Sequence, residues 1–326
     1  MTTPNPWDLK SILLEKIKNH GGFVNAHAHF DKSYTISLDK LAYSHTSINE
    51  KWKINNEIKK GFTEKDLVER ISRAIENMIG QGVSTVMTFA DVDSETGLKH
   101  LKATIIARDI YKNKITLLVA NQITRGILDA DEQKIHEEAA ELVDIIGGLA
   151  DFEHPNEDKH IEFVLKLAKK HNKRAQIHID QDNDPDQKVT EILAQKTIDI
   201  GVEGQVMGAH AVSLAAQDKK YRSSVIDLLK NSGVSIIVCP VGAISMRQLD
   251  KIAPSHNSIA PVVELIEAGV NVALGTDNIY DLYSPFGNGD MYKECEYLMD
   301  ICRWWDLNSV AKIASINGRQ ALGISL

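Results

Sequence analysis

Histidine and aspartate side chains stand at the ends of several short apolar segments of this sequence. His27 and His29 close the first such segment, and because side chains alternate along a β-strand, residues spaced by two leave the same face. His178, His210 and Asp277 stand at or near the ends of three later apolar segments. Neutral imidazole and carboxylate suit Zn²⁺ or Fe²⁺ as ligands. The pattern predicts a divalent metal site, provided that the fold brings these segment ends together.

The elements that must position these residues alternate between strand and helix. Short segments rich in Val, Ile and Leu predict strands over 22–28, 84–90, 115–121, 142–149, 175–180, 205–210, 234–240 and 270–277. Apolar residues at helical spacing predict helices over 65–80, 160–171, 188–200 and 259–268. This order indicates a parallel sheet, either closed into a (β/α)₈ barrel or open and doubly wound. In a barrel the carboxyl ends of the strands converge on one mouth, which is where barrel enzymes place their chemistry.

Two further groups of polar residues are expected away from the site. The stretch 33–62 is long for a connection, so we expect a loop over the barrel mouth. Its lysines alternate with glutamates and predict a solvated helical face rather than a binding patch: Lys51, Lys53, Lys59 and Lys60. Several other histidines lie on predicted helices or helix ends and are expected at the surface: His20, His100, His136, His160 and His171.

Composition excludes some classes of protein. The chain has 326 residues and a net charge of −8, which argues against nucleic acid or an anionic membrane as a partner. No apolar run approaches the ~18 residues of a membrane-spanning helix, and no signal peptide is visible. The three cysteines, Cys239, Cys295 and Cys302, form no CxxC pair and fit reduced thiols. We therefore expect a cytoplasmic enzyme with a small-molecule substrate, and leave open whether it is a homo-oligomer.

Two motifs at the ends of the chain resemble a known family. Residues 24–32 read VNAHAHFDK, which is similar to the HxHxDK signature of the amidohydrolase superfamily and of its cytosine deaminase branch in particular. Residues 275–279 (GTDNI) and 285–291 (PFGNGDM) look like the motif at strand eight and the turn after it. The resemblance runs from about Gly21 to Ile324. It implies a TIM barrel that hydrolyses C–N bonds of a polar nitrogen heterocycle, as a deaminase or amidohydrolase, through a metal-activated water.

The resemblance also assigns roles to residues. It implies that His27, His29, His178 and Asp277 bind the metal, and that His210 touches the metal-bound water or the substrate. The predicted fourth strand supplies neither a lysine nor a glutamate, as relatives with two metals do, which favours one Zn²⁺ or Fe²⁺. Substrate contacts are expected from three amides: Gln122, Gln181 and Asn278.

One departure from the family concerns proton transfer. Cytosine deaminase carries a glutamate three residues after the strand-five histidine, where it shuttles protons, and this sequence has Gln181 there. An amide cannot accept and return a proton at neutral pH. Asp180 is the best substitute, because two residues after His178 it should face the same side of the strand; a helix cap or loop residue is the equal alternative. Asp277 is expected to take the proton of the water, and His210 to polarise the leaving group or the oxyanion.

A second departure concerns domains and leaves alternatives for the function. Relatives carry a small β-sandwich built from both chain ends, whereas about 20 residues precede the first strand here and read as a helix over 8–18. We therefore expect residues 1–326 to form a single barrel domain without the sandwich. Opening of a cyclic amide is a variant of the proposed hydrolysis. The alternative from another class is a metal-binding protein in which Gln181 marks a lost activity.

Overall fold

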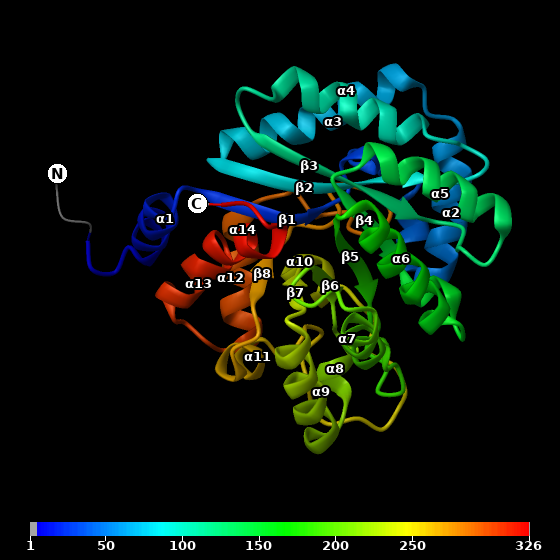
Figure 1. Cartoon of the computed structure of the whole chain (residues 1–326). Helices are drawn as coiled ribbons and strands as arrows, with labels where there is room; N and C mark the ends of the chain where they lie inside the picture. The colour runs from blue at the N-terminus through cyan, green and yellow to red at the C-terminus, as the bar shows by residue number, and fades with distance from the viewer. Residues whose placement is uncertain (1–4, 326) are drawn as a thin grey trace.

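The computed structural model describes residues 5–325, and its centre is one sheet of eight parallel strands (Figure 1). The strands are neighbours in chain order from first to last, as in a (β/α)₈ barrel, which confirms the barrel and excludes the doubly wound alternative. They are β1 (Phe23–Ala28), β2 (Val83–Val92), β3 (Thr116–Ile123), β4 (Ile145–Leu149), β5 (Arg174–Ile179), β6 (Val206–His210), β7 (Ser235–Val238) and β8 (Val272–Leu274).

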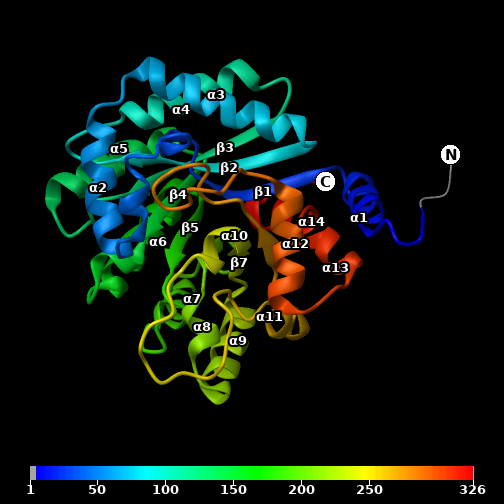
Figure 2. The ribbon, with the colours of Figure 1, turned by 180° about the vertical axis from the view of Figure 1, so that it is seen from behind.

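Helices surround the strands, and their apolar faces supply most of the core (Figures 1 and 2). In α3, Leu67, Ile71 and Ile75 are buried at spacings of four, and Thr63 begins the helix with a capping box to Asp66. The main helices are α1 (Leu9–Asn19), α2 (Ile48–Lys60), α3 (Glu64–Gly80), α4 (Lys99–Tyr111), α5 (Ala130–Leu142), α6 (Glu157–His171), α7 (Val189–Ile200), α9 (Lys219–Ser232), α11 (Val262–Ala268), α12 (Met291–Cys302), α13 (Leu307–Ile313) and α14 (Ile316–Leu322). Two short helices follow strands, α8 (Ser213–Ala216) and α10 (Pro240–Ile244).

The barrel closes between β1 and β8 with little regular pairing. A single bridge joins Ala28 to Asp277, and the Asp277 amide donates to the His27 carbonyl at 3.0 Å. The side chain of Asn25 adds two bonds across the seam, donating to the Thr276 hydroxyl at 2.8 Å and accepting from the Thr276 amide at 3.1 Å. A Cβ at Gly275 would lie 2.6 Å from the His27 Cβ, so glycine permits this close approach. The seam therefore lies directly beside His27.

Three expectations about polar residues are wrong. The stretch 33–62 is not only a loop, because it contains α2. Lys59 is buried on that helix, where its ammonium pairs with Asp93 at 2.5 Å and donates to the Thr124 hydroxyl at 2.6 Å. The expected surface position also fails for His100, His136 and His160, whose rings pack between their helices and the barrel. Helical position alone did not show which side of the helix each ring occupies.

The described part of the chain bears on two more expectations. Between residues 5 and 325, the eight-stranded barrel is the one sheet, so no β-sandwich accompanies it in that range. The single-domain organisation stays a prediction. None of the helices in this range has the length and apolar character needed to cross a membrane.

Candidate metal centre

Four of the residues expected to bind a metal converge at the carboxyl end of the barrel. The Nε2 atoms of His29 and His178 lie 3.2 Å apart. The Asp277 Oδ1 atom lies 3.6 Å from His27 Nε2 and 3.4 Å from His29 Nε2. His27 lies on β1 and His29 directly after it, His178 lies on β5, and Asp277 follows β8; their side chains are largely buried. The sequence expectation that strand ends bring them together agrees with this geometry.

Hydrogen bonds on the far side of two rings orient their lone pairs inward. His27 Nδ1 lies 2.6 Å from the Gln176 Oε1 atom, and His178 Nδ1 lies 2.9 Å from the Gly148 carbonyl oxygen. Because both partners are oxygen acceptors, each Nδ1 carries the proton and each Nε2 presents a lone pair. His27 Nε2 has no hydrogen-bond partner among residues 5–325. Such outer bonds are typical of histidines that bind metals.

This donor set fits a divalent cation. Burial holds the pKa values of His29 and His178 well below the ordinary value, so both imidazoles are neutral near neutral pH and can offer nitrogen lone pairs to a cation. The carboxylate of Asp277 adds a negative charge beside them. A cation at this point would satisfy all of these atoms. Three imidazole nitrogens and one carboxylate oxygen suit Zn²⁺ or Fe²⁺.

Two more residues border the cluster. His210 ends β6, and its ring centroid lies 5.1 Å from that of His27 and 5.4 Å from that of His178. Burial lowers the pKa of His210 to about 4, so its imidazole is neutral near pH 7. Cys239, directly after β7, places its Sγ within 4.8 Å of a ligand atom of His27 and of Asp277. Burial raises the pKa of Cys239 well above its ordinary value, which keeps the thiol protonated. The sequence analysis missed Cys239, although its place at a strand end was the available signal.

The residues after His29 are hydrogen-bonded to the neighbouring strand, β2. Lys32 donates to the Asp91 carboxylate at 2.6 Å, and Asp31 accepts from the Asp91 amide at 2.9 Å. His100 on α4 lies 2.9 Å from the same Asp31 oxygen through its Nδ1. These bonds link the segment after β1 to β2 and α4, so the two motif residues that bind no metal hold His29 in place.

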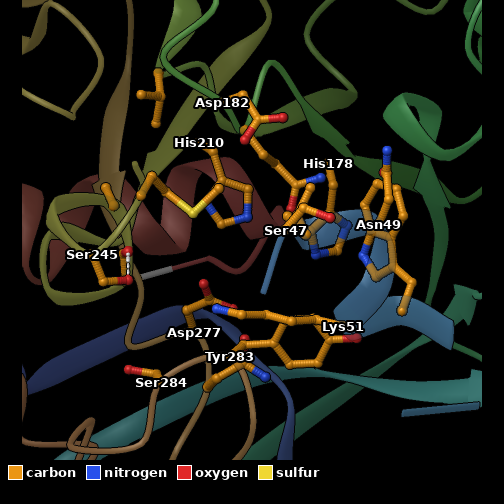
Figure 3. A pocket seen from close by; sticks show the side chains of 18 of the residues that line it. Ser47, Asn49, Lys51, His178, Asp182, His210, Ser245, Asp277, Tyr283 and Ser284 are labelled. Carbon is orange, nitrogen blue, oxygen red and sulfur yellow. Dashed lines mark hydrogen bonds between the residues drawn. The ribbon is translucent and has the colours of Figure 1, made fainter. Parts of the chain in front are cut away.

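A cavity of about 310 Å³ opens in front of the centre (Figure 3). His29, His178, His210 and Asp277 form its floor, and Figure 3 shows the last three turned toward the same space. The three amides expected to contact substrate all line it: Gln122, Gln181 and Asn278. Trp52 on α2 and Tyr283 add aromatic surface to the wall. The cavity therefore combines a polar floor, amide groups and aromatic faces.

Asp180 does not lie where the strand pattern placed it. Its carboxylate accepts from the Val189 and Thr190 amides, each at 3.0 Å, and from the Thr190 hydroxyl at 2.5 Å. It thus caps α7 and does not line the cavity. Alternation fails because β5 ends at Ile179 and Asp180 adopts a left-handed conformation with φ of 51°. The expected orientation is wrong, and the helix-cap alternative matches this geometry.

Gln181 and its neighbour occupy the cavity wall in place of Asp180. The Gln181 amide group donates to the Asp151 carboxylate at 3.2 Å, which fixes the orientation of the side chain. The next residue, Asp182, also lines the cavity, and its carboxylate makes no ion pair or side-chain hydrogen bond within residues 5–325. Burial raises the pKa of Asp182, and Asp184 raises it further. Sequence reasoning did not single out Asp182.

Comparisons with known proteins agree with the geometry. The model of the Amidohydrolase family matches residues 21–326. N-isopropylammelide isopropyl amidohydrolase of Pseudomonas sp. (strain ADP) is 27% identical over 93% of this chain and 74% of its own length. Pterin deaminase of Rhizobium rhizogenes is 21% identical over 92% of this chain and 70% of its own length. The structure of 5-methylcytosine deaminase from Klebsiella pneumoniae liganded with 5-fluorocytosine superposes with a TM-score of 0.86 at 26% identity, covering 92% of this chain and 74% of that one. The chain belongs to the amidohydrolase family.

Proposed function

We propose that this protein is a metal-dependent hydrolase that cleaves a C–N bond of a polar nitrogen heterocycle, most simply by removing an exocyclic amine. The observation that carries the proposal is the position of the donor cluster. His27, His29, His178 and Asp277 converge at one point, and the last three of them line the floor of a cavity of about 310 Å³, large enough for a small ring. The relatives compared above are named for 5-methylcytosine, pterin and N-isopropylammelide, all nitrogen heterocycles.

The proposed hydrolysis assigns separate roles to the metal ligands, Asp277 and His210. A divalent ion held by His27, His29, His178 and Asp277 would supply Lewis acidity and would lower the pKa of a bound water toward neutrality. Asp277 Oδ1 lies 3.4–3.6 Å from the nitrogens of His29 and His27, so its carboxylate is available there to accept a proton. His210 is neutral, so it can donate one hydrogen bond to an oxygen or leaving nitrogen on the substrate without adding a charge.

The cavity wall favours a flat ring with several polar edges. Gln122 has a buried Oε1 without a partner among residues 5–325, and the Asn278 amide nitrogen is already engaged by Asp281, which leaves the Asn278 oxygen for a substrate N–H. Gln181 adds a third amide on the same cavity. Trp52 and Tyr283 offer faces against which such a ring can stack.

Proton delivery to the leaving nitrogen is proposed for Asp182. Gln181 cannot carry a proton, and the carboxylate of Asp180 is committed to the start of α7. Asp182 lines the cavity with a carboxylate that has no ion pair or side-chain hydrogen bond among residues 5–325, and burial raises its pKa toward the range useful for a general acid. Figure 3 shows its carboxylate on the same side of the cavity as His210 and His178.

Ammonia release tests the proposal. Protein loaded with Zn²⁺ or Fe²⁺ is incubated with aminopyrimidines, aminotriazines, aminopurines and pterins, and the His178→Ala protein serves as the control. We expect release of ammonia from at least one ring with the metal-loaded protein alone. A gain of one water in the product mass without ammonia would instead identify ring opening.

The second candidate is a metal-binding protein without hydrolytic activity. The observation that favours it is the presence of Gln181, whose amide cannot carry a proton. Tight ligand binding at the loaded site, with no turnover of any ring in the panel, would support that candidate and contradict the first.

A further inference from the structure

Two cationic side chains on the cavity wall have no counter-ion. Lys32, Lys53 and Lys59 each pair with a carboxylate at 2.5–2.7 Å. Lys51 on α2 and Arg247 after α10 also line the cavity, but neither forms an ion pair with any residue in the described range 5–325. Figure 3 shows the Lys51 side chain directed into the cavity. A lysine that could reach solvent normally extends into it, so this orientation requires a reason.

The charged groups around Lys51 do not balance the positive charge of its ammonium. Burial lowers the pKa of Lys51, Asp281 raises it, and Arg247 lowers it again by repulsion. Asp281 compensates weakly, because burial raises its own pKa to about 6 and its carboxylate already accepts from Asn278 and from the Ser284 amide. Lys51 and Arg247 thus place two positive charges near one another at the edge of the cavity.

The start of α2 adds to the positive potential there. This helix begins at Ile48 with Ser47 as its cap, and both residues line the cavity together with Asn49. The amino end of a helix carries a partial positive charge that favours anions. The negative groups on the wall are Asp277, whose charge belongs to the metal, and Asp182. The part of the cavity near Lys51 and Arg247 is therefore suited to an anion.

Resting on the hydrolase function proposed above, we propose that the substrate is an anionic heterocycle whose negative group binds between Lys51 and Arg247. The group is a carboxylate attached to the ring or an ionised ring oxygen, which share the same chemistry at this site. The ring then lies over the amides and the metal centre with its acidic group toward α2. Trp52, one residue after Lys51, lines the same cavity and offers an aromatic face to the ring.

Binding of rings without an exocyclic amine tests this inference separately from turnover. Uracil is compared with uracil-5-carboxylate and uracil-6-carboxylate for the carboxylate, and with barbiturate for the ring oxyanion, by calorimetry on metal-loaded protein. We expect at least one anionic ring to bind about ten- to a hundredfold more tightly than uracil, the range expected for a hydrogen-bonded charge. Tighter binding of a uracil carboxylate would identify the group as a carboxylate, and tighter binding of barbiturate would identify it as a ring oxyanion. Failure of every anionic ring to exceed uracil would overturn the proposal.

Substitutions of Lys51 and Arg247 test whether these residues bind the anionic group. Lys51→Met and Arg247→Met should each remove most of the gain in affinity that the anionic ring shows over uracil, while Lys51→Arg should keep that gain. Lys53→Met is the matched control, because Lys53 lies on the same helix, pairs with Glu50 and does not line the cavity. An equal loss in Lys53→Met and Lys51→Met would overturn the assignment. Anion binding without hydrolysis of any ring would contradict the proposed function alone. Hydrolysis of neutral rings, together with no tighter binding of any anionic ring than of uracil, would overturn this inference alone.

Discussion

His178 is the residue at which the metal centre can be tested most directly. Its Nδ1 is bound to the Gly148 carbonyl, so its only role toward the cluster is through Nε2. We expect His178→Ala to lose most of the bound metal, measured by elemental analysis of the purified protein, and the other three ligand positions to behave alike. His154→Ala is the control, because that ring is exposed and does not line the cavity. Full metal occupancy in His178→Ala would contradict the assigned centre.

Asp182 and Asp180 form a second pair of tests at this scale. Asp182→Asn should lower kcat by roughly 10²–10⁴, the usual size of general acid–base catalysis, with metal content unchanged. Asp180→Asn should instead lower the free energy of unfolding by about 1 kcal/mol, the usual effect of losing a helix cap, and change kcat little. Turnover with any substrate found in the ammonia screen and urea unfolding separate the two effects. A large loss of kcat in Asp180→Asn alone would restore the shuttle first assigned to Asp180.

The residue pattern predicted the cluster but not its surroundings. His27 and His29 could be placed because strand alternation and convergence of parallel strands together determine where their rings lie. Asp180 could not, because the strand ends one residue before it and its positive φ rotates the side chain away. Asp182 lies in the irregular connection that follows, where no periodicity applies. Its position depends on contacts that the sequence alone does not reveal.

At the scale of elements, periodicity identified all eight strands, with ends shifted by a few residues. It also identified helices that bury an apolar face, over 65–80, 160–171, 188–200 and 259–268. The helix α2 differs from these, because its buried positions are Asn55, Asn56 and Lys59. These polar residues bond to Asp91, Thr124 and Asp93 rather than packing in the apolar core. A helix that buries a polar face shows no apolar period, so the stretch was predicted to be a loop.

A buried histidine between α5 and β3 should make the stability of the protein depend on pH. His136 is buried there, and its Nδ1 accepts from the Asn121 amide at 3.3 Å. Burial lowers the pKa of His136 to about 3, below the ordinary value of 6.5 that it regains on unfolding. Below pH 6.5 His136 therefore binds a proton in the unfolded chain but not in the folded protein. Its contribution lowers the free energy of unfolding as the pH falls.

The His136→Gln variant isolates that contribution. Glutamine can still accept from Asn121 but does not titrate. The unfolding free energy of the original protein minus that of the variant should fall by about 1.6 kcal/mol between pH 6.5 and pH 5, because the full slope of about 1.4 kcal/mol per pH unit is reached only below the unfolded pKa of 6.5. Urea unfolding at both pH values measures the difference, and other titrating groups cancel in the subtraction. A difference that stays constant with pH would show that His136 is protonated in the folded protein.

At the scale of the whole molecule, the proposed metal ligands lie at the place where the barrel closes. His27 and His29 lie on one side of the β1–β8 seam and Asp277 on the other, while His178 reaches them from β5 across the barrel. The regular backbone pairing at the seam is a single bridge, supplemented by Asn25. A bound cation would therefore join the first and last strands as well as activate water. The sequence predicted the ligands but not this seam, because strand lengths at a barrel closure depend on how all eight strands pack.

Removal of the metal should then loosen the seam before the rest of the barrel. We expect a chelator to speed hydrogen exchange of amides in residues 24–30 and 272–280, measured by mass spectrometry of peptides. Peptides from β2 and β3 serve as the internal control, because these strands pair continuously from Thr85↔Thr116 to Val92↔Ile123. Return of Zn²⁺ or Fe²⁺ should restore protection, since a ligand that binds only the folded state stabilises it. The His178→Ala protein should show the fast pattern with or without chelator. Uniform exchange across all strands on metal removal, or no change at the seam, would mean that the barrel closes independently of the metal and that the centre serves chemistry alone.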